Sequence, residues 1–428
     1  MWEQIRYNQT RSAMLIFGMG ILLALLGHFF GILIGNLPIL NIDLFISGIY
    51  GVLIALMIWV VASMIAYLKG DDILLALTGA QKISTVDLER LKNIVEELKI
   101  ASGLEKMPDI YIIEDPAMNA FATGRDPNKA AVVVTSGLLT KLNRDELQGV
   151  IGHEIAHIKN RDVLLMSLCF VLLGIITNLT WTFVHVMYSV RNSSSVPSGW
   201  WFPLILLLIP TIATPFVIRS GLFGEFAAAL AVLYFFAFLL LSPMIAQLVY
   251  HAISKRREYL ADACSALYTR YPEGLALALE KIAASPDQVL AVSPATAPIY
   301  IVNPFHEPGK VASDITSTHP PISERIRILR AMAQASYAEY DRAYREIRGV
   351  HKGLIPAYAT ATAGTAAIRE AIPDDLDHIQ RARETSNALW NARNYSIITC
   401  ACGTRMRLPP SFKLTEVRCP HCGRINPV

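Results

Sequence analysis

The stretch GVIGHEIAHIKNRD, residues 149–162, combines two histidines four positions apart with a glutamate beside the first. Residues four apart project from one face of an α-helix, so His153 and His157 can bind one metal ion through their imidazole nitrogens. Glu154 is rotated from them by about 100°, which directs its carboxylate toward water beside the metal rather than toward the metal. This is the pattern in which glutamate serves as a catalytic general base. The alternative, two histidines on a solvated helix face, is disfavoured by the surrounding sequence.

An open catalytic zinc site needs a third protein ligand. The stretch RREYLADA, residues 256–263, places Glu258 and Asp262 four apart on a second predicted helix. We expect Glu258 to complete the metal site and Asp262 to orient a ligating histidine. Taken alone, these two residues would be assigned to a solvated acidic face with basic neighbours, and the HEIAH motif reverses that preference.

The polar region around the motif predicts a small α+β domain. Residues 86–102 have apolar side chains at helical spacing. The segments DIYIIED (109–115), NAFAT (119–123) and AAVVVTSG (130–137) predict strands, and GRDPN supplies a hairpin turn between the last two. The helix that carries HEIAH is expected to begin near Asn143.

Long apolar segments predict an integral membrane protein. The chain is 53% hydrophobic and 17% charged, against about 25% charge in soluble domains. Spanning helices of about 20 apolar residues are predicted at 12–36, 44–68, 163–188 and 226–250. A further apolar run, 200–218, contains three prolines. Because HEIAH and Glu258 must lie on one membrane face, an even number of crossings must separate them, so this run is predicted to be re-entrant or interfacial.

Basic residues predict the orientation of these spans. Arg6 and Arg11 precede the first span and Lys69 follows the second, whereas the loop at 37–43 has neither Lys nor Arg. Basic residues favour the cytoplasmic side, so we predict a multi-pass protein of the cell membrane with its catalytic domain on the cytoplasmic side. The net charge of +3, from 38 basic and 35 acidic residues, gives no reason to propose nucleic-acid binding. The expected partners are the lipid bilayer and protein or peptide substrates.

Five segments, in order, resemble the HtpX-type membrane zinc metallopeptidases, which are related to the CAAX prenyl proteases. They are NAFATG (119–124), VVVTSGLL (132–139), GHEIAHIKNRD (152–162), SKRREYLADA (254–263) and STHPPISERI (317–326). The resemblance implies a mainly helical, zincin-like catalytic domain with a small β-sheet. It also supports His153, His157 and Glu258 as the zinc ligands, and it alone suggests a role in protein quality control.

The resemblance implies further roles within the site. His319 would approach the substrate carbonyl and hydrogen-bond the developing oxyanion, although sequence alone would place it in a helix-entry loop. Arg325 would pair with active-site carboxylates. The strand containing Asn119, Ala120 and Phe121 would bind extended substrate by strand addition, or else only pack within the sheet.

The end of the chain carries a second candidate metal site. Cys400 and Cys402 form one pair, Cys419 and Cys422 form another, and a glycine follows each pair. Glycine lets the backbone turn tightly around a metal, and four thiolates fit a structural tetrahedral zinc. The first pair is C-x-C, which departs from the usual zinc-ribbon spacing; redox-active dithiols are the alternative, and His421 could replace one ligand. We therefore expect two zinc ions per chain, one catalytic and one structural.

The predicted fold class is an α+β integral membrane protein in six parts. These are an N-terminal membrane hairpin (1–70), a first catalytic part with the HEIAH helix (71–162), a membrane region (163–253), a second catalytic part (254–335), a helical linker (336–395) and a zinc-ribbon-like module (396–428).

The predicted function is that of a membrane-embedded zinc endopeptidase that cleaves membrane-associated or misfolded proteins at the cytoplasmic face. One alternative is a dedicated protease for specific substrates, such as prenylated proteins. Another is a zinc-stabilised membrane scaffold that no longer cleaves, which the intact HEIAH motif disfavours. A transporter is disfavoured by the lack of charges within the predicted spans.

Overall fold

The structure is a computed structural model of the 428-residue chain. It describes residues 43–83, 88–163, 255–287, 299–302, 319–356, 364–373 and 376–428, with residue 360 and scattered positions between 10 and 31. The chain divides into two compact units, one of residues 1–5, 69–167 and 252–428, the other of residues 6–68 and 168–251. The span predicted at 12–36 is described at scattered positions, all of them helical, whereas the spans predicted at 163–188 and 226–250 and the run at 200–218 lie outside the described residues apart from Val163.

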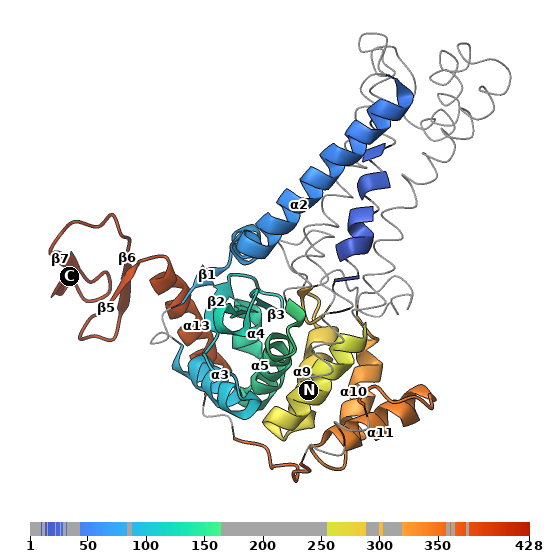
Figure 1. Ribbon diagram of the computed structural model, residues 1–428. Coiled ribbons are helices and arrows are strands. Elements are labelled where there is room, and N and C mark those ends of the chain that lie inside the picture. The colour runs from blue at the N-terminus through green and yellow to red at the C-terminus, as the bar shows by residue number, and fades with distance from the viewer. Residues whose placement is uncertain are drawn as a thin grey trace, which may run out of the picture. The chain divides into compact units, whose positions relative to one another are not determined.

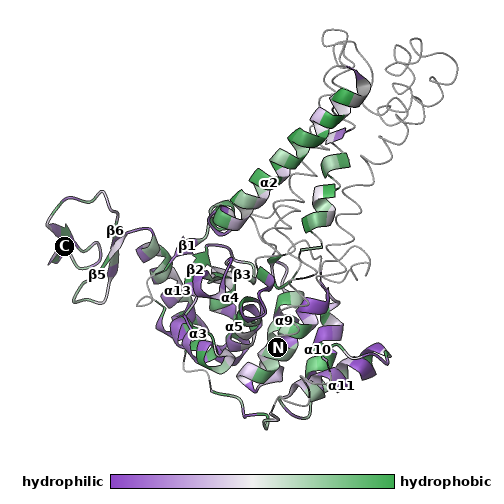
Figure 2. Cartoon of the chain, viewed as in Figure 1, coloured by the Kyte–Doolittle hydropathy of each residue, from purple (hydrophilic) through white to green (hydrophobic). Residues whose placement is uncertain are grey.

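One helix within the described residues is long and apolar enough to cross a membrane. Helix α2 runs from Leu44 to Leu77, and its segment Ile46–Ile65 meets that test. Large apolar side chains such as Met57 are exposed along this segment, and Figure 2 shows the helix as mainly hydrophobic. Such a surface suits lipid better than water. The predicted span at 44–68 therefore lies within a helix that continues for about two further turns.

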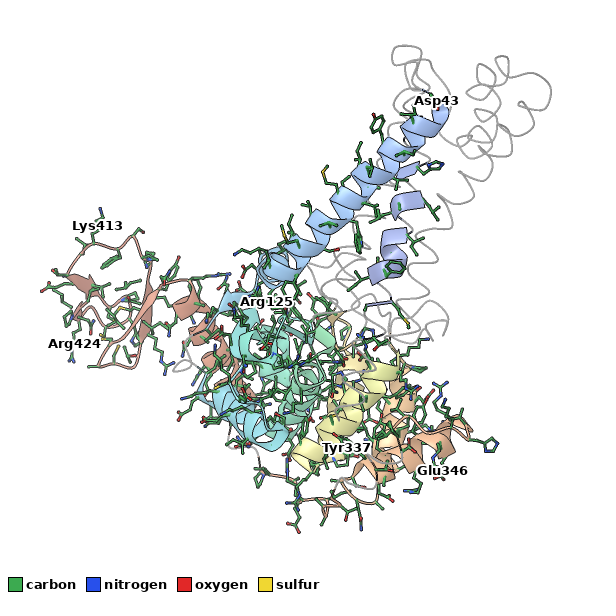
Figure 3. The ribbon with its side chains drawn as sticks, in the orientation of Figure 1. Asp43, Arg125, Tyr337, Glu346, Lys413 and Arg424 are labelled. Atoms are coloured by element: carbon green, nitrogen blue, oxygen red, sulfur yellow. The ribbon has the colours of Figure 1, made fainter. Side chains whose placement is uncertain are left out.

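The continuation of α2 connects to the sheet within its own compact unit. Asp71 accepts hydrogen bonds from Thr123 Oγ1 at 3.3 Å and from the Arg125 backbone N–H at 3.2 Å. Arg125 is labelled beside this end of α2 in Figure 3. Burial raises the pKa of Asp71 despite these two donors. The polar end of the helix is thus fixed to the end of one strand.

The sheet has four strands in the order β1-β2-β4-β3. Their bounds are Gln81–Lys82 for β1, Asp109–Ile113 for β2, Ala120–Thr123 for β3 and Ala131–Thr135 for β4. The predicted hairpin is confirmed, because β3 pairs antiparallel with β4 and places Phe121 opposite Val133. Strand β4 also pairs parallel with β2, so β3 is left at one edge of the sheet.

Helices pack around this sheet and around one another (Figure 1). They are α3 (Glu89–Ser102), α4 (Ser136–Lys141), α5 (Arg144–Lys159), a helix over residues 255–269, α9 (Pro272–Ala284), α10 (Ile322–Arg330), α11 (Tyr337–Arg348) and α13 (His378–Ala392). Helix α5 contacts α3 on one side and α9 on the other. Fully buried residues such as Ile94, Val132, Ile151 and Leu279 form the shared core. This core holds the motif helix α5 in the middle of the unit.

The C-terminal residues form two small antiparallel hairpins. Strands β5 (Ser396–Thr399) and β6 (Arg405–Leu408) make the first, and β7 (Glu416–Arg418) and β8 (Ile425–Pro427) make the second. Each hairpin turn contains one of the two cysteine pairs.

Candidate metal centre

Helix α5 begins where the sequence predicts. The Asn143 side chain accepts from the Glu146 backbone N–H, and the Glu146 carboxylate accepts from the Asn143 N–H, both at 2.9 Å. This reciprocal capping satisfies two backbone donors that the helix itself leaves unpaired. About two and three turns after Glu146, His153 and His157 are buried with their Nε2 atoms 3.2 Å apart.

Glu258, on the 255–269 helix, faces both histidines. Its Oε2 lies 3.5 Å from His153 Nε2, and its Oε1 lies 3.4 Å from His157 Nε2. Zinc binds nitrogen and oxygen at about 2.0–2.1 Å in tetrahedral geometry, so two of its ligands stand roughly 3.3–3.4 Å apart. The three measured separations therefore match one triangular face of a zinc tetrahedron. The residues fit the ion and leave a fourth position for water or substrate.

Two glycines let the neighbouring helices approach α5 this closely. A Cβ on Gly152 would lie 2.9 Å from Ser265 Oγ, and one on Gly149 would lie 2.6 Å from the Leu275 backbone nitrogen. Ser265 also donates a hydrogen bond to the Gly149 carbonyl at 2.7 Å. The close contact of the 255–269 helix with α5 brings Glu258 within reach of the histidines.

A buried ion pair lies behind His153. Asp262 Oδ1 is 2.9 Å from His153 Nδ1, and Arg325 donates to both Asp262 oxygens at 2.7 and 2.8 Å. Burial would raise the pKa of Asp262, but Arg325 and His153, through their charges and hydrogen bonds, together lower it. A charged Asp262 accepts from Nδ1–H and leaves Nε2 free to face Glu258. Arg325 also donates to the Ile301 carbonyl at 3.0 Å, so it joins the metal centre to that segment.

Glu154 and His319 lie in the same buried environment. Burial raises the pKa of Glu154, and its Oε1 accepts no hydrogen bond from any residue that the structure describes. His319 precedes α10, and its Nε2 is 4.0 Å from Glu258 Oε2. Burial lowers the pKa of His319 to about 4. A neutral imidazole therefore stands beside the three potential ligands.

The candidate substrate strand already contacts another part of the chain. Ala120 O accepts from Ile301 N at 3.0 Å, and Asn119 Nδ2 donates to Val302 O at 3.0 Å. Phe121 is fully buried. Backbone groups alternate in direction along a strand, so Ala122 presents its N–H and C=O on the same outer edge as Ala120. The role of Asn119, Ala120 and Phe121 in binding substrate stays a prediction.

The four C-terminal cysteines form a second cluster. Their Sγ atoms all lie within 4.8 Å of one another, with Cys400 to Cys422 at 3.5 Å and Cys402 to Cys419 at 3.6 Å. Two thiolates on tetrahedral zinc stand roughly 3.8 Å apart, given zinc–sulfur bonds of about 2.3 Å. The glycine after each pair has a positive φ, 85° for Gly403 and 73° for Gly423. His421 does not belong to this cluster of potential ligands.

Asp162, the last residue of GVIGHEIAHIKNRD, makes a contact that the sequence does not predict. Its Oδ2 lies 3.3 Å from His157 Nδ1. A residue five positions after a helical histidine points to a different helix face, so periodicity could not identify the contact. The one available signal was a carboxylate close in sequence to a potential ligand.

Comparisons with known proteins cover most of the chain. Residues 87–333 match the peptidase family M48. A protein named Protease HtpX homolog from Dictyoglomus turgidum is 40% identical over 293 residues, which make up 68% of this chain and 86% of that protein. Proteins with the same name from Dictyoglomus thermophilum and Lactobacillus helveticus are 37% and 34% identical; both alignments cover 78% of this chain, with 95% and 100% of the relatives.

Among solved structures, the crystal structure of S. mikatae Ste24p aligns with 77% of this chain and 67% of its own. The identity is 17% and the TM-score is 0.35, a value too low to assign a fold.

Proposed function

This chain belongs to peptidase family M48 and is a zinc metalloprotease, and we propose that His153, His157 and Glu258 hold its catalytic zinc. The observation that carries the proposal is the triangle of 3.2, 3.4 and 3.5 Å between their facing atoms. A zinc ion with three protein ligands lowers the pKa of water and polarises a peptide carbonyl.

Glu154 is the proposed general base. It takes a proton from the attacking water and passes it to the leaving amine. Burial raises its pKa, which makes the carboxylate a stronger base. His319 is neutral at ordinary pH because burial lowers its pKa to about 4. We assign to it the donation of a hydrogen bond to the carbonyl oxygen as negative charge develops there.

The proposed substrates are membrane-associated or misfolded proteins, cleaved at the cytoplasmic face. Support comes from α2, which contains the apolar segment and continues beyond it as one helix. In this continuation, Asp71 accepts hydrogen bonds from Thr123 and Arg125 at the end of β3. A multi-pass topology with a cytoplasmic catalytic unit rests on the predicted spans and on the basic residues that flank them. Dedicated cleavage of specific substrates is the main alternative, and comparing unfolded and prenylated substrates distinguishes the two.

Extended substrate is proposed to add to the edge of β3. The outward N–H and C=O of Ala122 supply hydrogen bonds for such a strand. At Ala120 the substrate would have to replace the contact from Ile301. Replacing Ala122 by proline removes one donor from that edge, and KM for a long peptide should rise more than KM for a dipeptide analogue.

A second, structural zinc is proposed at Cys400, Cys402, Cys419 and Cys422. The separations of their sulfur atoms and the tight turns at the following glycines support it. Four protein ligands leave no open position, so this ion has no catalytic role. The redox alternative predicts disulfides on mild oxidation, and zinc-bound thiolates would resist it.

The deciding experiment compares Glu154→Gln with Glu146→Gln in the full chain purified in detergent. Both glutamates are buried on α5, but Glu146 caps the helix and pairs with Lys281, away from the metal centre. Glu154→Gln should keep its zinc and lose about 10²- to 10⁴-fold in cleavage of an unfolded protein. Glu146→Gln should stay within a few-fold of the parent. Undiminished cleavage by Glu154→Gln would rule out the general-base assignment, and Glu258→Ala that keeps all its zinc would rule out the ligand set.

A further inference from the structure

A buried carboxylate lies behind His157, on the side away from Glu258. Asp162 is fully buried, and its Oδ2 is 3.3 Å from His157 Nδ1. On its other side, Asp162 Oδ1 is 3.6 Å from Nε of the buried Arg257. That distance makes an ion pair rather than a hydrogen bond. The arrangement runs from the imidazole through a carboxylate to a guanidinium.

The same arrangement lies behind the other histidine. His153 Nδ1 faces Asp262, which pairs with Arg325. In both histidines, Nδ1 faces a carboxylate while Nε2 faces Glu258. If Nε2 of each ring binds a metal, the carboxylate facing Nδ1 favours the tautomer with its proton on Nδ1.

The backbone after α5 is shaped to bring Asp162 to this position. The helix ends at Lys159, and Arg161 takes a φ of 57°, in the left-handed region that favours glycine. Such a conformation is unfavourable for a residue that has a Cβ atom. It reverses the chain, so that a residue five positions after His157 returns to the imidazole. Buried Asn160 donates to Cys264 Sγ at 3.8 Å, which fixes the turn to the 255–269 helix.

We propose that Asp162, supported by the charge of Arg257, is a positioning residue for His157. It accepts the Nδ1–H hydrogen bond, holds the ring plane and directs an unprotonated Nε2 toward the metal. The inference rests on the proposed function, because it takes His157 as a zinc ligand. Asp262 and Asp162 then form a matched pair, one for each histidine, and the turn at Arg161 exists to supply the second member.

The test compares Asp162→Ala, Asp162→Asn and Asp145→Asn in the full chain. Asp145 is a matched control: it is a buried aspartate on α5, but it pairs with Arg369 and accepts from Ile372 N. Zinc affinity is measured by competition with a chelator. Cobalt replaces zinc, and the absorption spectrum of the cobalt-loaded His157→Ala variant is subtracted from that of each other protein. The subtraction removes any signal from cobalt at the cysteine cluster.

Asp162→Ala should weaken zinc binding at the histidine site about 10- to 100-fold and change the cobalt spectrum. Asp162→Asn should lose less, because its amide oxygen still accepts from Nδ1–H. At saturating zinc, kcat should fall with KM nearly unchanged, and Asp145→Asn should alter neither zinc affinity nor spectrum.

The proposal is overturned if Asp162→Ala keeps its zinc affinity and its cobalt spectrum unchanged. A thermal stability lowered as in Asp145→Asn would then make Asp162 a purely structural residue. If His157→Ala itself keeps full zinc, the ligand set is wrong. The two failures are therefore distinguishable.

Discussion

Adding one methyl group at Gly152 should weaken both the fold and the metal site. In Gly152→Ala the new Cβ would lie 2.9 Å from Ser265 Oγ, whereas ordinary contacts begin at 3.4 Å. The 255–269 helix must therefore move by about 0.5 Å or Ser265 must change rotamer. Overpacking of this kind costs about 1–3 kcal/mol, while alanine gains up to about 1 kcal/mol in helix propensity. With the full gain in helix propensity, the net loss should be between about 0 and 2 kcal/mol.

The same displacement should reach the zinc ligands. Ser265 lies seven residues after Glu258, which is two turns along the same helix face. Metal–ligand distances tolerate only about 0.2 Å, so a shift of that size should reduce zinc affinity roughly tenfold. Gly152→Ala/Ser265→Ala should recover much of this affinity, because the clashing oxygen is gone. The double variant still lacks the Ser265 hydrogen bond to Gly149, worth about 1 kcal/mol.

The assay is a double-mutant cycle on the two singles and the double variant. Zinc affinity comes from chelator competition, and stability comes from thermal unfolding in detergent. Gly364→Ala is the control, because a Cβ there would meet no atom within 4 Å. If Gly152→Ala binds zinc as tightly as the parent and unfolds at the same or a higher temperature, close helix approach is not what requires this glycine. Additive effects in the cycle would also refute the reasoning.

Three further predictions follow from the buried charges, the tail and the predicted spans. Arg325→Met should lose about 3–5 kcal/mol, because it leaves a buried carboxylate unpaired, while Arg330→Met, whose ion pairs are exposed, should lose under about 1 kcal/mol in the same unfolding assay. Truncation after Tyr395 should remove one zinc and keep small-peptide cleavage; an unchanged metal count would mean that the tail binds no zinc. Single cysteines at Lys106 and Arg270 should react with an impermeant reagent from the cytoplasmic side, and one at Ser194 should react from the other side. Labelling of the first two from opposite sides would refute the prediction that an even number of membrane crossings separates HEIAH from Glu258.

The motif helix could be predicted from sequence because its determinants are local. Asn143 and Glu146 form the predicted start of α5 through a contact three residues apart. The hairpin of β3 and β4 followed from a turn sequence between two apolar runs. Strand β1 was missed because two residues, Gln81–Lys82, are too short to show any alternation. Its position depends on pairing with β2, about 30 residues away along the chain.

Within the candidate site, the sequence predicts which residues share a helix face, but it does not predict how closely two helices pack or where a residue beyond the helix points. Spacing predicted that His153 and His157 share a helix face, and it predicted the same for Glu258 and Asp262. It gave no information on how closely α5 and the 255–269 helix approach, because that distance depends on Gly152, where a side chain would meet Ser265.

The position of Asp162 is a second feature of the site that the sequence does not predict. A helical continuation would have turned it away from His157, and the contact exists only because Arg161 adopts a φ of 57°. No composition or period encodes that reversal, since a non-glycine residue takes it only where tertiary contacts impose it. Arg270 and Asn394 also take a positive φ, but the turn at Arg161 is the one of these three that lies beside a carboxylate facing a potential metal ligand. The backbone conformation of Arg161 therefore decides whether Asp162 can accept a hydrogen bond from His157, and through it the geometry of the proposed metal site.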